Sequence, residues 1–269
     1  MENRPFPDSS MRGLPCVITI GVFDGMHPGH QAIIDETVRT ARELHVSSVV
    51  LTFSVNPKMS LCTIPSVPAL QSRMQFQEML SDRGINYNCV IDFSDDMSKL
   101  SGEEFIALLC TSYEVRAMVV GDSFRAGASA HSAGPSEIGR LLSKYTSSAY
   151  LRVIPSVVIG NETVSSSLIR GCLLTGDTGK ASVLLGRAYG LDLRGAPSVE
   201  EGGSGDPGPI RLLYDVRTLG LLLPRAGKYM VEATAEGRAV RATAFVSENR
   251  LALELPVRMI PDGITFPGA

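Results

Sequence analysis

The stretch from residue 17 to residue 30, VITIGVFDGMHPGH, holds the residues of this chain best suited to chemistry. His27 and His30 bracket Gly29, so both imidazoles can face one spot with no side chain between them. An apolar, β-branched run opens the stretch and predicts a buried strand, while a helical pattern starts directly after His30. Free N–H groups and the helix dipole at such a junction attract anions, so we expect a site for nucleotide phosphates.

The motif around the two histidines indicates which class of nucleotide-binding protein to expect. The dinucleotide fingerprint GxGxxG and the P-loop pattern GxxxxGK[ST] are both absent from the stretch, which disfavours a NAD site or a P-loop kinase. An HxGH motif at the start of a helix that follows the first strand is typical of nucleotidyltransferases, because imidazoles can stabilise charge developing on a phosphoryl group. Two surface histidines near a helix start are the alternative interpretation.

Composition limits the classes of protein that the chain can belong to. Its 269 residues are 44% hydrophobic and 20% charged, so it can bury a large core, and its net charge of −3 argues against a general nucleic-acid or membrane-surface binder. The five cysteines form no CxxC pair, which disfavours a zinc site or a disulfide framework. We find no signal-peptide pattern and no long apolar run, and we therefore expect a cytoplasmic protein without a membrane partner.

The elements that must position the motif alternate between strand and helix. Residues 31–45 have helical periodicity and lead to the β-branched run at 47–53, which predicts a βαβ unit. Ser101 and Glu104 have the spacing of a capping box before the helical run 103–113. The alternation continues and predicts a doubly wound α/β fold with a parallel, Rossmann-like sheet. Ligands of such sheets bind beyond the carboxyl ends of the strands, where the motif lies.

The composition changes after Gly190. The segment GAPSVEEGGSGDPGP, residues 195–209, is typical of a linker or a long loop, and short strand-like runs with intervening turns follow it. We therefore expect a first domain of residues 1–190, a linker of residues 191–209 and a small all-β domain of residues 210–269. Four or five short apolar strands could leave an open edge, so self-association through this domain is an open expectation.

Five segments together resemble a known family. GVFDGMHPGH resembles the signature of the bacterial riboflavin kinase/FAD synthetase family, in its FMN adenylyltransferase module. The other four follow in the family's order: LTFSVNP (51–57), VVGDSFRAG (119–127), VSSSLIR (164–170) and LLGRAY (184–189). The resemblance covers about residues 15–190, and the ordered set is far more specific than any one segment.

This resemblance implies a reaction and a set of site residues. FMN attacks the α-phosphorus of ATP, pyrophosphate leaves and FAD forms, with Mg²⁺ held mostly by phosphate oxygens and water rather than by a protein metal site. The implied catalytic residues are His27, His30 and Arg170. The implied ATP-binding residues are Gly21, Phe23, Asp24, Gly25, Gly29, Ser165 and Ser166, and the implied FMN-binding residues are Asn56, Pro57, Phe124 and Arg125. Asp24 fits a turn-stabilising role equally well, and Arg170 could also be a solvated helix residue.

The chain departs from the family pattern in two regions. Asn56 stands where the family has histidine, and Ser123 and Ala126 replace an acidic and an aromatic residue, which reshapes one wall of the flavin or adenine pocket. The C-terminal part retains LLPRAGKYMVEA, similar to a strand of the family's riboflavin kinase barrel, but has no PTAN motif, so we expect the kinase activity to be lost.

Two other functions remain open at this point. A nucleotidyltransferase acting on another phosphorylated acceptor, as in the cytidylyltransferases that share HxGH, would explain the altered segments. A non-catalytic flavin or nucleotide sensor, with the β domain as a partner-binding surface, is the alternative outside enzymes. In each case the expected ligands are small molecules and not nucleic acid.

Overall fold

The computed structural model describes residues 1–54, 68–92, 95–128, 131–201, 209–248 and 250–267. These residues form two compact units. Unit 1 comprises Met1–Phe23, Gly29–Ser66 and Gln77–Thr163, and unit 2 comprises Asp24–Pro28, Val67–Phe76 and Val164–Ala269. The HxGH stretch therefore contributes residues to both units, and the domain boundaries predicted at residues 190 and 209 stay a prediction.

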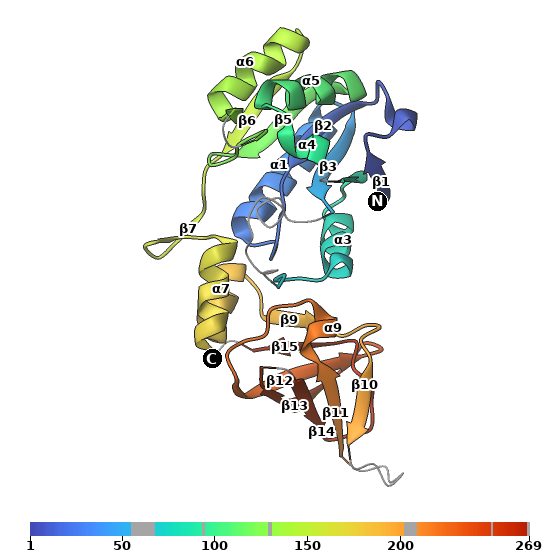
Figure 1. The fold of residues 1–269 in the computed structure, drawn as a ribbon, viewed down its shortest axis with the longest axis vertical. Helices are drawn as coiled ribbons and strands as arrows, with labels where there is room; N and C mark the ends of the chain where they lie inside the picture. Colours follow the sequence, from blue (N-terminus) through green and yellow to red (C-terminus); the bar gives the residue numbers. More distant parts are fainter. Residues whose placement is uncertain (55–67, 93–94, 129–130, 202–208, 249, 268–269) are drawn as a thin grey trace. The chain divides into compact units, whose positions relative to one another are not determined.

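Unit 1 is built on a parallel six-stranded sheet with the order β1-β4-β3-β2-β5-β6, drawn in Figure 1. All of its strand pairs are parallel. The strands are β1 (Glu2–Phe6), β2 (Pro15–Ile20), β3 (Ser47–Phe53), β4 (Tyr87–Ile91), β5 (Glu114–Gly121) and β6 (Tyr150–Ile154). This order confirms the predicted doubly wound, Rossmann-like fold.

The direction of the strand order reverses at β2. From β2 the chain adds β3 and β4 on one side, whereas β5 and β6 extend the sheet on the other side. In open α/β sheets the crevice that binds ligands lies at such a switch point, outside the carboxyl ends of the strands. Here those ends are Ile20 of β2 and Gly121 of β5, so the HxGH stretch starts at the switch point.

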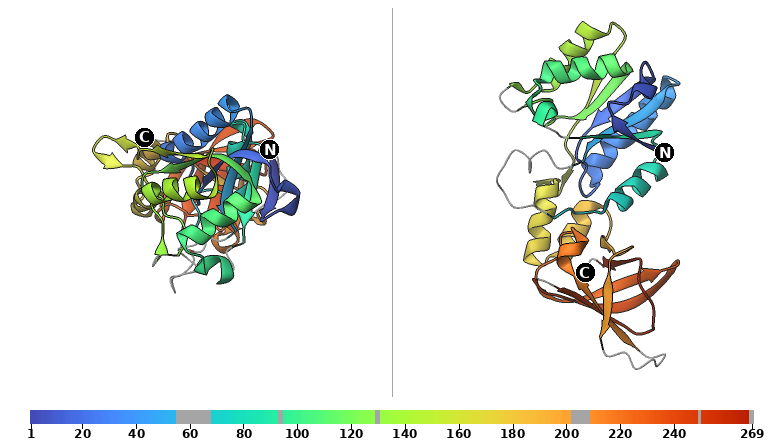
Figure 2. Two further views of the ribbon diagram at one scale, coloured as in Figure 1. Left: turned by 90° about the horizontal axis from the view of Figure 1, so that it is seen from above. Right: turned by 45° about the vertical axis from the view of Figure 1, so that its right-hand side comes forward.

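Helices cover both faces of the parallel sheet, and alternate residues of β2 point to opposite faces. Ile18 packs in a core cluster with residues of α5 (Gly102–Ser112) and α6 (Pro135–Tyr145). Val17 packs instead with Ala41 of α1 (Pro28–Glu43). The left view of Figure 2 shows α1 in blue and the green helices on opposite sides of the strands. Covering both faces explains why these strands are nearly continuous apolar runs.

Several shorter elements precede α7 in the chain. They are η1 (Ser9–Met11), α3 (Arg73–Asp82), α4 (Asp95–Lys99), β7 (Val158–Ile159) and β8 (Glu162–Thr163). The helix α3 begins at Arg73 because Ser72 and Gln75 cap it reciprocally: the backbone N–H of Gln75 donates to Ser72 Oγ, and that of Ser72 donates to Gln75 Oε1. Both groups would otherwise lack a partner in the first turn.

Unit 2 contains a separate antiparallel sheet, which confirms the predicted all-β part. Within the described residues its order is β10-β11-β14-β13-β12-β15-β9. The strands are β9 (Tyr189–Asp192), β10 (Ser198–Glu201), β11 (Ile210–Asp215), β12 (Gly227–Ala235), β13 (Arg238–Val246), β14 (Arg250–Leu255) and β15 (Gly263–Phe266), and the helices are α7 (Ser166–Thr175), α8 (Thr178–Leu185) and α9 (Val216–Leu219).

Part of the segment predicted as a linker is regular structure. Ser198–Glu201 forms β10 and pairs with β11, although Val199 is 68% exposed. Tyr189–Asp192 forms β9 and pairs with β15. Both strands are stabilised by partners distant in sequence, which local composition does not reveal. Among the described residues, no helix is long and apolar enough to cross a membrane.

The predicted capping box at the start of α5 is present and generates a stability prediction. Ser101 Oγ accepts from the backbone N–H of Glu104, and the Glu104 carboxylate accepts from the backbone N–H of Ser101. Replacing Ser101→Ala should lower the free energy of unfolding by about 1 kcal/mol because it leaves an N–H without its acceptor. Urea denaturation curves measure this change. Ser143→Ala is the control, since that hydroxyl bonds only to a carbonyl of its own helix among the described contacts; an equal effect of both changes would contradict the prediction.

Candidate active site

The carboxyl end of β2 leads into a tightly packed aromatic cluster in unit 1. Phe23 has a left-handed backbone, with φ of +50°, and its ring is 3% exposed. A Cβ on Gly21 would lie 2.9 Å from that ring, so any side chain at residue 21 would displace it. The ring meets His30 edge to face, with 5.4 Å between centroids. The structure thus brings Gly21, Phe23 and His30 together as predicted site residues.

The start of α1 follows from its sequence. Pro28 is the first helical residue, where its missing N–H costs nothing, and Gly29 is the second. His30 therefore lies in the first turn, the end of a helix that favours negative charge. The sequence order of Pro28, Gly29 and His30 places an imidazole beside the first backbone N–H groups of the helix.

The residues between strand and helix have an unusual backbone. Gly25 and Met26 have φ of +83° and +37°, which adds to the left-handed Phe23. Non-glycine residues with positive φ are strained by about 1–2 kcal/mol each, and such strain persists where the surroundings impose it. These left-handed residues lead directly into His27.

Within unit 2, Asp24 is the centre of a network that links distant segments. Its carboxylate accepts a hydrogen bond from the backbone N–H of Leu70, at 2.9 Å, and forms an ion pair with Arg170 of α7. Its backbone carbonyl accepts from Ser166 Oγ, at 2.8 Å. The Asp24 side chain is 12% exposed and that of Arg170 is 17% exposed, so both are largely removed from water.

Burial and pairing act in opposite directions on Asp24. Burial raises the pKa of its carboxyl, and the Arg170 guanidinium and the backbone N–H groups of Leu70 and Gln71 oppose this rise. The carboxylate oxygens bond to Leu70 and Arg170 on other segments, so Asp24 acts as a tertiary anchor. A turn-stabilising role of the same side chain stays a prediction.

His27 is buried in unit 2 and 6% exposed. Burial lowers its pKa to about 4, and the positive charge of Arg187 contributes to the decrease. At neutral pH the imidazole is therefore uncharged and carries one N–H donor and one acceptor nitrogen. His27 can act on a phosphate as a hydrogen-bond donor, not as a fixed cation.

The predicted serines belong to the start of α7. Ser165 is the N-cap, and its hydroxyl accepts from the backbone N–H of Leu168 at 3.2 Å. Ser166 is the first helical residue and lies one turn before Arg170 on the same helix. The SSLIR segment thus combines a capped helix N-terminus with a guanidinium, in unit 2 together with Asp24, Gly25 and His27.

The residues implied for flavin binding are only partly described. Asn56 and Pro57 lie outside the described residues. Phe124 follows β5 in unit 1 and packs against the main core cluster, while Arg125 is exposed. A Cβ on Gly134, at the start of α6, would lie 2.5 Å from Arg125 Nη1, so this arginine lies across that helix terminus.

The structure adds residues that sequence reasoning did not assign to the site. Arg187 donates a hydrogen bond from Nη1 to the Gly25 carbonyl, at 3.0 Å, and Leu70 packs on Gly25. Arg187 is part of LLGRAY, one of the segments that carry the family resemblance. Its place in this segment is the sequence signal that could have identified it as a site residue. Leu70 offered no such signal, since its hydrogen bond to Asp24 uses the backbone N–H.

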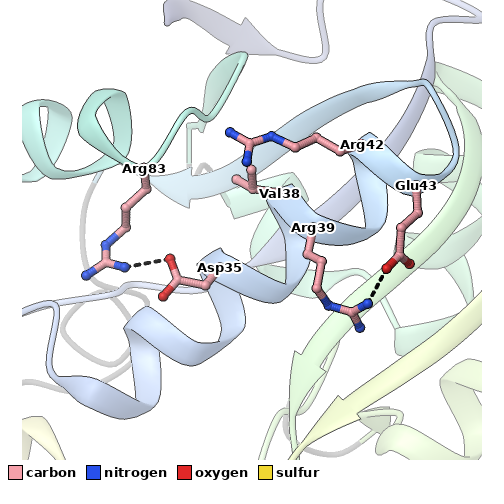
Figure 3. A pocket seen from close by; sticks show the side chains of 6 residues that line it. All are labelled: Asp35, Val38, Arg39, Arg42, Glu43 and Arg83. Atoms are coloured by element: carbon pink, nitrogen blue, oxygen red, sulfur yellow. Dashed lines mark hydrogen bonds and ion pairs between the residues drawn. The ribbon is translucent and has the colours of Figure 1, made fainter.

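A pocket of about 320 Å³ lies elsewhere in unit 1, on the exposed side of α1. Figure 3 shows its charged lining, in which Arg83 pairs with Asp35 and Arg39 pairs with Glu43. None of the predicted site residues lines it. Its charges are mostly paired with one another, and the HxGH stretch stays the candidate site. No group of three or more His, Cys, Asp and Glu among the described residues could hold a metal ion.

The strand order and flanking helices place unit 1 in the class of Rossmann-like, doubly wound α/β folds. The sequence model described as FAD synthetase matches residues 10–168, more than half of the chain. The chain belongs to the FAD synthetase family, whose members are nucleotidyltransferases of FAD biosynthesis.

Individual relatives agree with this assignment. A bifunctional riboflavin kinase/FMN adenylyltransferase of Listeria monocytogenes is 26% identical over 191 residues, which are 70% of this chain and 59% of that protein. A protein with the same name in Escherichia coli is 28% identical over 222 residues, covering 77% of this chain and 69% of its own length. The chain thus spans about three fifths of the Listeria relative. A solved structure described as a macrolide-efflux protein from Streptococcus pneumoniae is similar to this chain, with a TM-score of 0.80 at 20% identity over 99% of this chain and 90% of that chain. At this identity the likeness shows the fold alone.

The buried state of His27 makes stability depend on pH. Below pH 6.5 the unfolded chain binds a proton at His27 that the folded chain excludes until about pH 4, so stability falls as the pH drops through this window. The loss attributable to His27 is up to about 3 kcal/mol. We expect His27→Gln to lose less stability between pH 6.5 and 4, measured by urea denaturation at a series of pH values.

The exposed His131 supplies the control for replacing a histidine by glutamine: His27→Gln should change the pH dependence of stability more than His131→Gln does. An NMR titration of the imidazole signals in the wild-type protein measures the same property without any variant. Titration of His27 near its ordinary value of about 6.5 would contradict the prediction.

Proposed function

We propose that this chain is an FMN adenylyltransferase that transfers AMP from ATP to FMN and releases FAD and pyrophosphate. The observation that carries the proposal is the family match over a chain in which the turn that leads into HxGH, residues 23–27, is strained, largely buried and anchored by the ion pair of Asp24 and Arg170. A phosphate oxygen of FMN forms a bond to the α-phosphorus while the bond from this phosphorus to the bridging oxygen of the β-phosphate breaks. Such a displacement requires positioning and charge stabilisation rather than a covalent protein intermediate.

The donor side of the site receives the roles that the family resemblance implies. His27 donates its neutral N–H, and His30 acts from the first turn of α1, on the oxygens of the α- and β-phosphates. Gly21, Gly25 and Gly29 leave room for the backbone to approach the nucleotide. Strengthening of these hydrogen bonds as charge moves to the pyrophosphate would lower the barrier.

Arg170 and its neighbours bind the outer phosphates in this proposal. The Arg170 Nε is buried and has no partner within the described residues, which supports a role toward an anion. Asp24 fixes the guanidinium direction, and Ser165 and Ser166 place the N-terminus of α7 beside it. A planar guanidinium then makes two parallel bonds to phosphate oxygens, which lysine cannot.

We propose that Mg²⁺ arrives bound to ATP. Asp24 is the carboxylate of the GVFDGMHPGH motif, and it already interacts with Arg170 and two backbone N–H groups. It therefore fits an anchor better than a metal ligand, and phosphate oxygens and water suit Mg²⁺ as ligands. The acceptor side comprises Phe124 and Arg125 together with Asn56 and Pro57, as the family resemblance implies.

We further propose that the chain lacks riboflavin kinase activity, because no PTAN motif occurs in it. Its β unit retains the strand-like segment LLPRAGKYMVEA, within which β12 begins.

Transfer to another phosphorylated acceptor remains the second candidate, since Ala126 replaces an aromatic residue of the family's loop. A cytoplasmic location and self-association through the β unit stay predictions.

Turnover assays test the proposal directly. With ATP, FMN and Mg²⁺ the protein should form FAD and pyrophosphate in equal amounts, detected by chromatography and a coupled pyrophosphate assay. Riboflavin in place of FMN should yield neither FMN nor FAD. Product from CTP or another phosphorylated acceptor, with none from FMN, would favour the second candidate, and binding without turnover would favour the sensor.

Substitution of the histidines tests their roles. His27→Ala and His30→Ala should each lower kcat by about 100-fold, because each removes a donor that acts on charge developing in the transition state. Steady-state rates with FAD as the measured product give this value. His131→Ala is the matched control in an exposed loop. Wild-type rates in both variants would show that the HxGH motif has no catalytic role.

A further inference from the structure

The C-terminal end of α8 contacts the 24–28 segment (Asp24–Pro28) through three consecutive residues, all in unit 2. A Cβ on Gly25 would lie 3.5 Å from Leu185 Cδ2, and a Cβ on Gly186 would lie 3.4 Å from Pro28 Cγ. The next residue, Arg187, donates its hydrogen bond to the Gly25 carbonyl at 3.0 Å. The end of α8 thus packs along the segment that carries His27.

The side chain of Arg187 is not needed to end α8. Gly186 is the left-handed C-cap, and its backbone N–H bonds to the carbonyls of Ser182 and Val183. The backbone N–H of Arg187 also donates to the Ser182 carbonyl, at 3.2 Å. Helix termination is therefore achieved by the backbone. The guanidinium is instead directed at Gly25, two residues before His27 in the sequence.

The hydrogen bond acts on a strained part of the backbone. Gly25 has φ of +83° and Met26 has φ of +37°, and a left-handed turn directs its carbonyls away from regular partners. A guanidinium donor makes a charge-assisted bond, which is stronger than a neutral one. This bond fixes the plane of the peptide between Gly25 and Met26.

The charge of Arg187 also reaches His27. Asp24 of the same segment is paired with Arg170 of α7, and the field of Arg187 adds to burial in lowering the pKa of His27. The same side chain therefore affects both the direction and the protonation of the imidazole. These are the two properties that an N–H donor to a phosphate requires.

We propose that Arg187 is a positioning residue that holds the Gly25–Met26 peptide and thereby sets the direction in which His27 presents its imidazole to the phosphates of ATP. The inference rests on the role proposed for His27. It adds to the site a residue that touches the turn and not the reacting atoms. A misplacement of about 1 Å at a catalytic group can cost 100-fold in rate, so a distant anchor can control kcat.

Variants of Arg187 separate positioning from simple stability. Arg187→Met should lower kcat about tenfold or more while leaving KM for FMN unchanged, and Arg187→Lys, which retains the charge and one donor group, should recover part of the loss. Arg217→Met is the control, because Arg217 pairs with Asp215 and its side chain is 80% exposed. Wild-type kcat in Arg187→Met, or a loss equal to that of Arg217→Met, would overturn the proposal.

An NMR titration gives a readout that needs no turnover. The chain has four histidines, so selective labelling resolves the imidazole of His27 in the substrate-free protein. Arg187→Met should shift the His27 pKa upward and Arg187→Lys should leave it near that of the wild type. An unchanged His27 signal in Arg187→Met would refute the contact itself. The titration would still report a shift if the protein proved inactive toward FMN. The contact of Arg187 with the His27 segment can therefore be tested independently of the proposed FMN adenylyltransferase activity. Should Arg187→Met fail to fold, Arg187→Lys and Arg187→Gln supply the same comparison, with Gln expected to raise the pKa.

Discussion

The buried ion pair between Arg170 and Asp24 is the interaction on which the arrangement of the candidate site in unit 2 depends. Removing two charges from water costs several kcal/mol each, and their attraction offsets this only with good geometry and further hydrogen bonds. Those bonds come from the backbone N–H groups of Leu70 and Gln71. The pair therefore joins three segments far apart in the sequence, and removal of one partner would leave an uncompensated charge inside the fold.

This anchor explains how a strained turn can persist. Phe23 and Met26 adopt left-handed backbone conformations that a free chain would avoid. Ser166 holds the Asp24 carbonyl and Arg187 holds the Gly25 carbonyl, so successive peptides are fixed from α7 and from the end of α8. These contacts hold the backbone leading to His27 at more than one peptide. The direction of the imidazole is then a property of unit 2 as a whole.

The sequence predicted the elements whose signal is local. The apolar runs of β2 and β3 and the capping box at Ser101 depend on residues a few positions apart, and the structure contains all three. The strands β1 and β10 depend on partners ten or more residues away along the chain, so neither periodicity nor composition revealed them. Local patterns report on propensity, whereas pairing is decided by the tertiary fold.

The candidate site shows the same division between features that local sequence patterns predict and features that tertiary contacts decide. The HxGH pattern placed His27 and His30 among the candidates, and the family resemblance added Arg170. Neither could show that His27 is buried, because burial depends on contacts with distant segments. The interaction of Asp24 with the backbone of Leu70 was also beyond prediction, since a backbone N–H carries no residue identity. Sequence patterns thus identified the side chains that could react, and the tertiary contacts determine their protonation and direction.

The charges of His27 and Arg170 determine how such a site could neutralise a triphosphate. His27 is uncharged at neutral pH, and the positive charge of Arg170 is largely compensated by Asp24. Neither group therefore supplies a full uncompensated cation, and the triphosphate charge would be neutralised mainly by the Mg²⁺ bound to ATP and by helix N-termini. What the residues do offer is a set of donors fixed in direction before the substrate arrives. Preorganised donors avoid reorganisation during the reaction, which is the larger part of electrostatic catalysis. For the reaction proposed here, the rigid turn thus matters more than the total charge of the site.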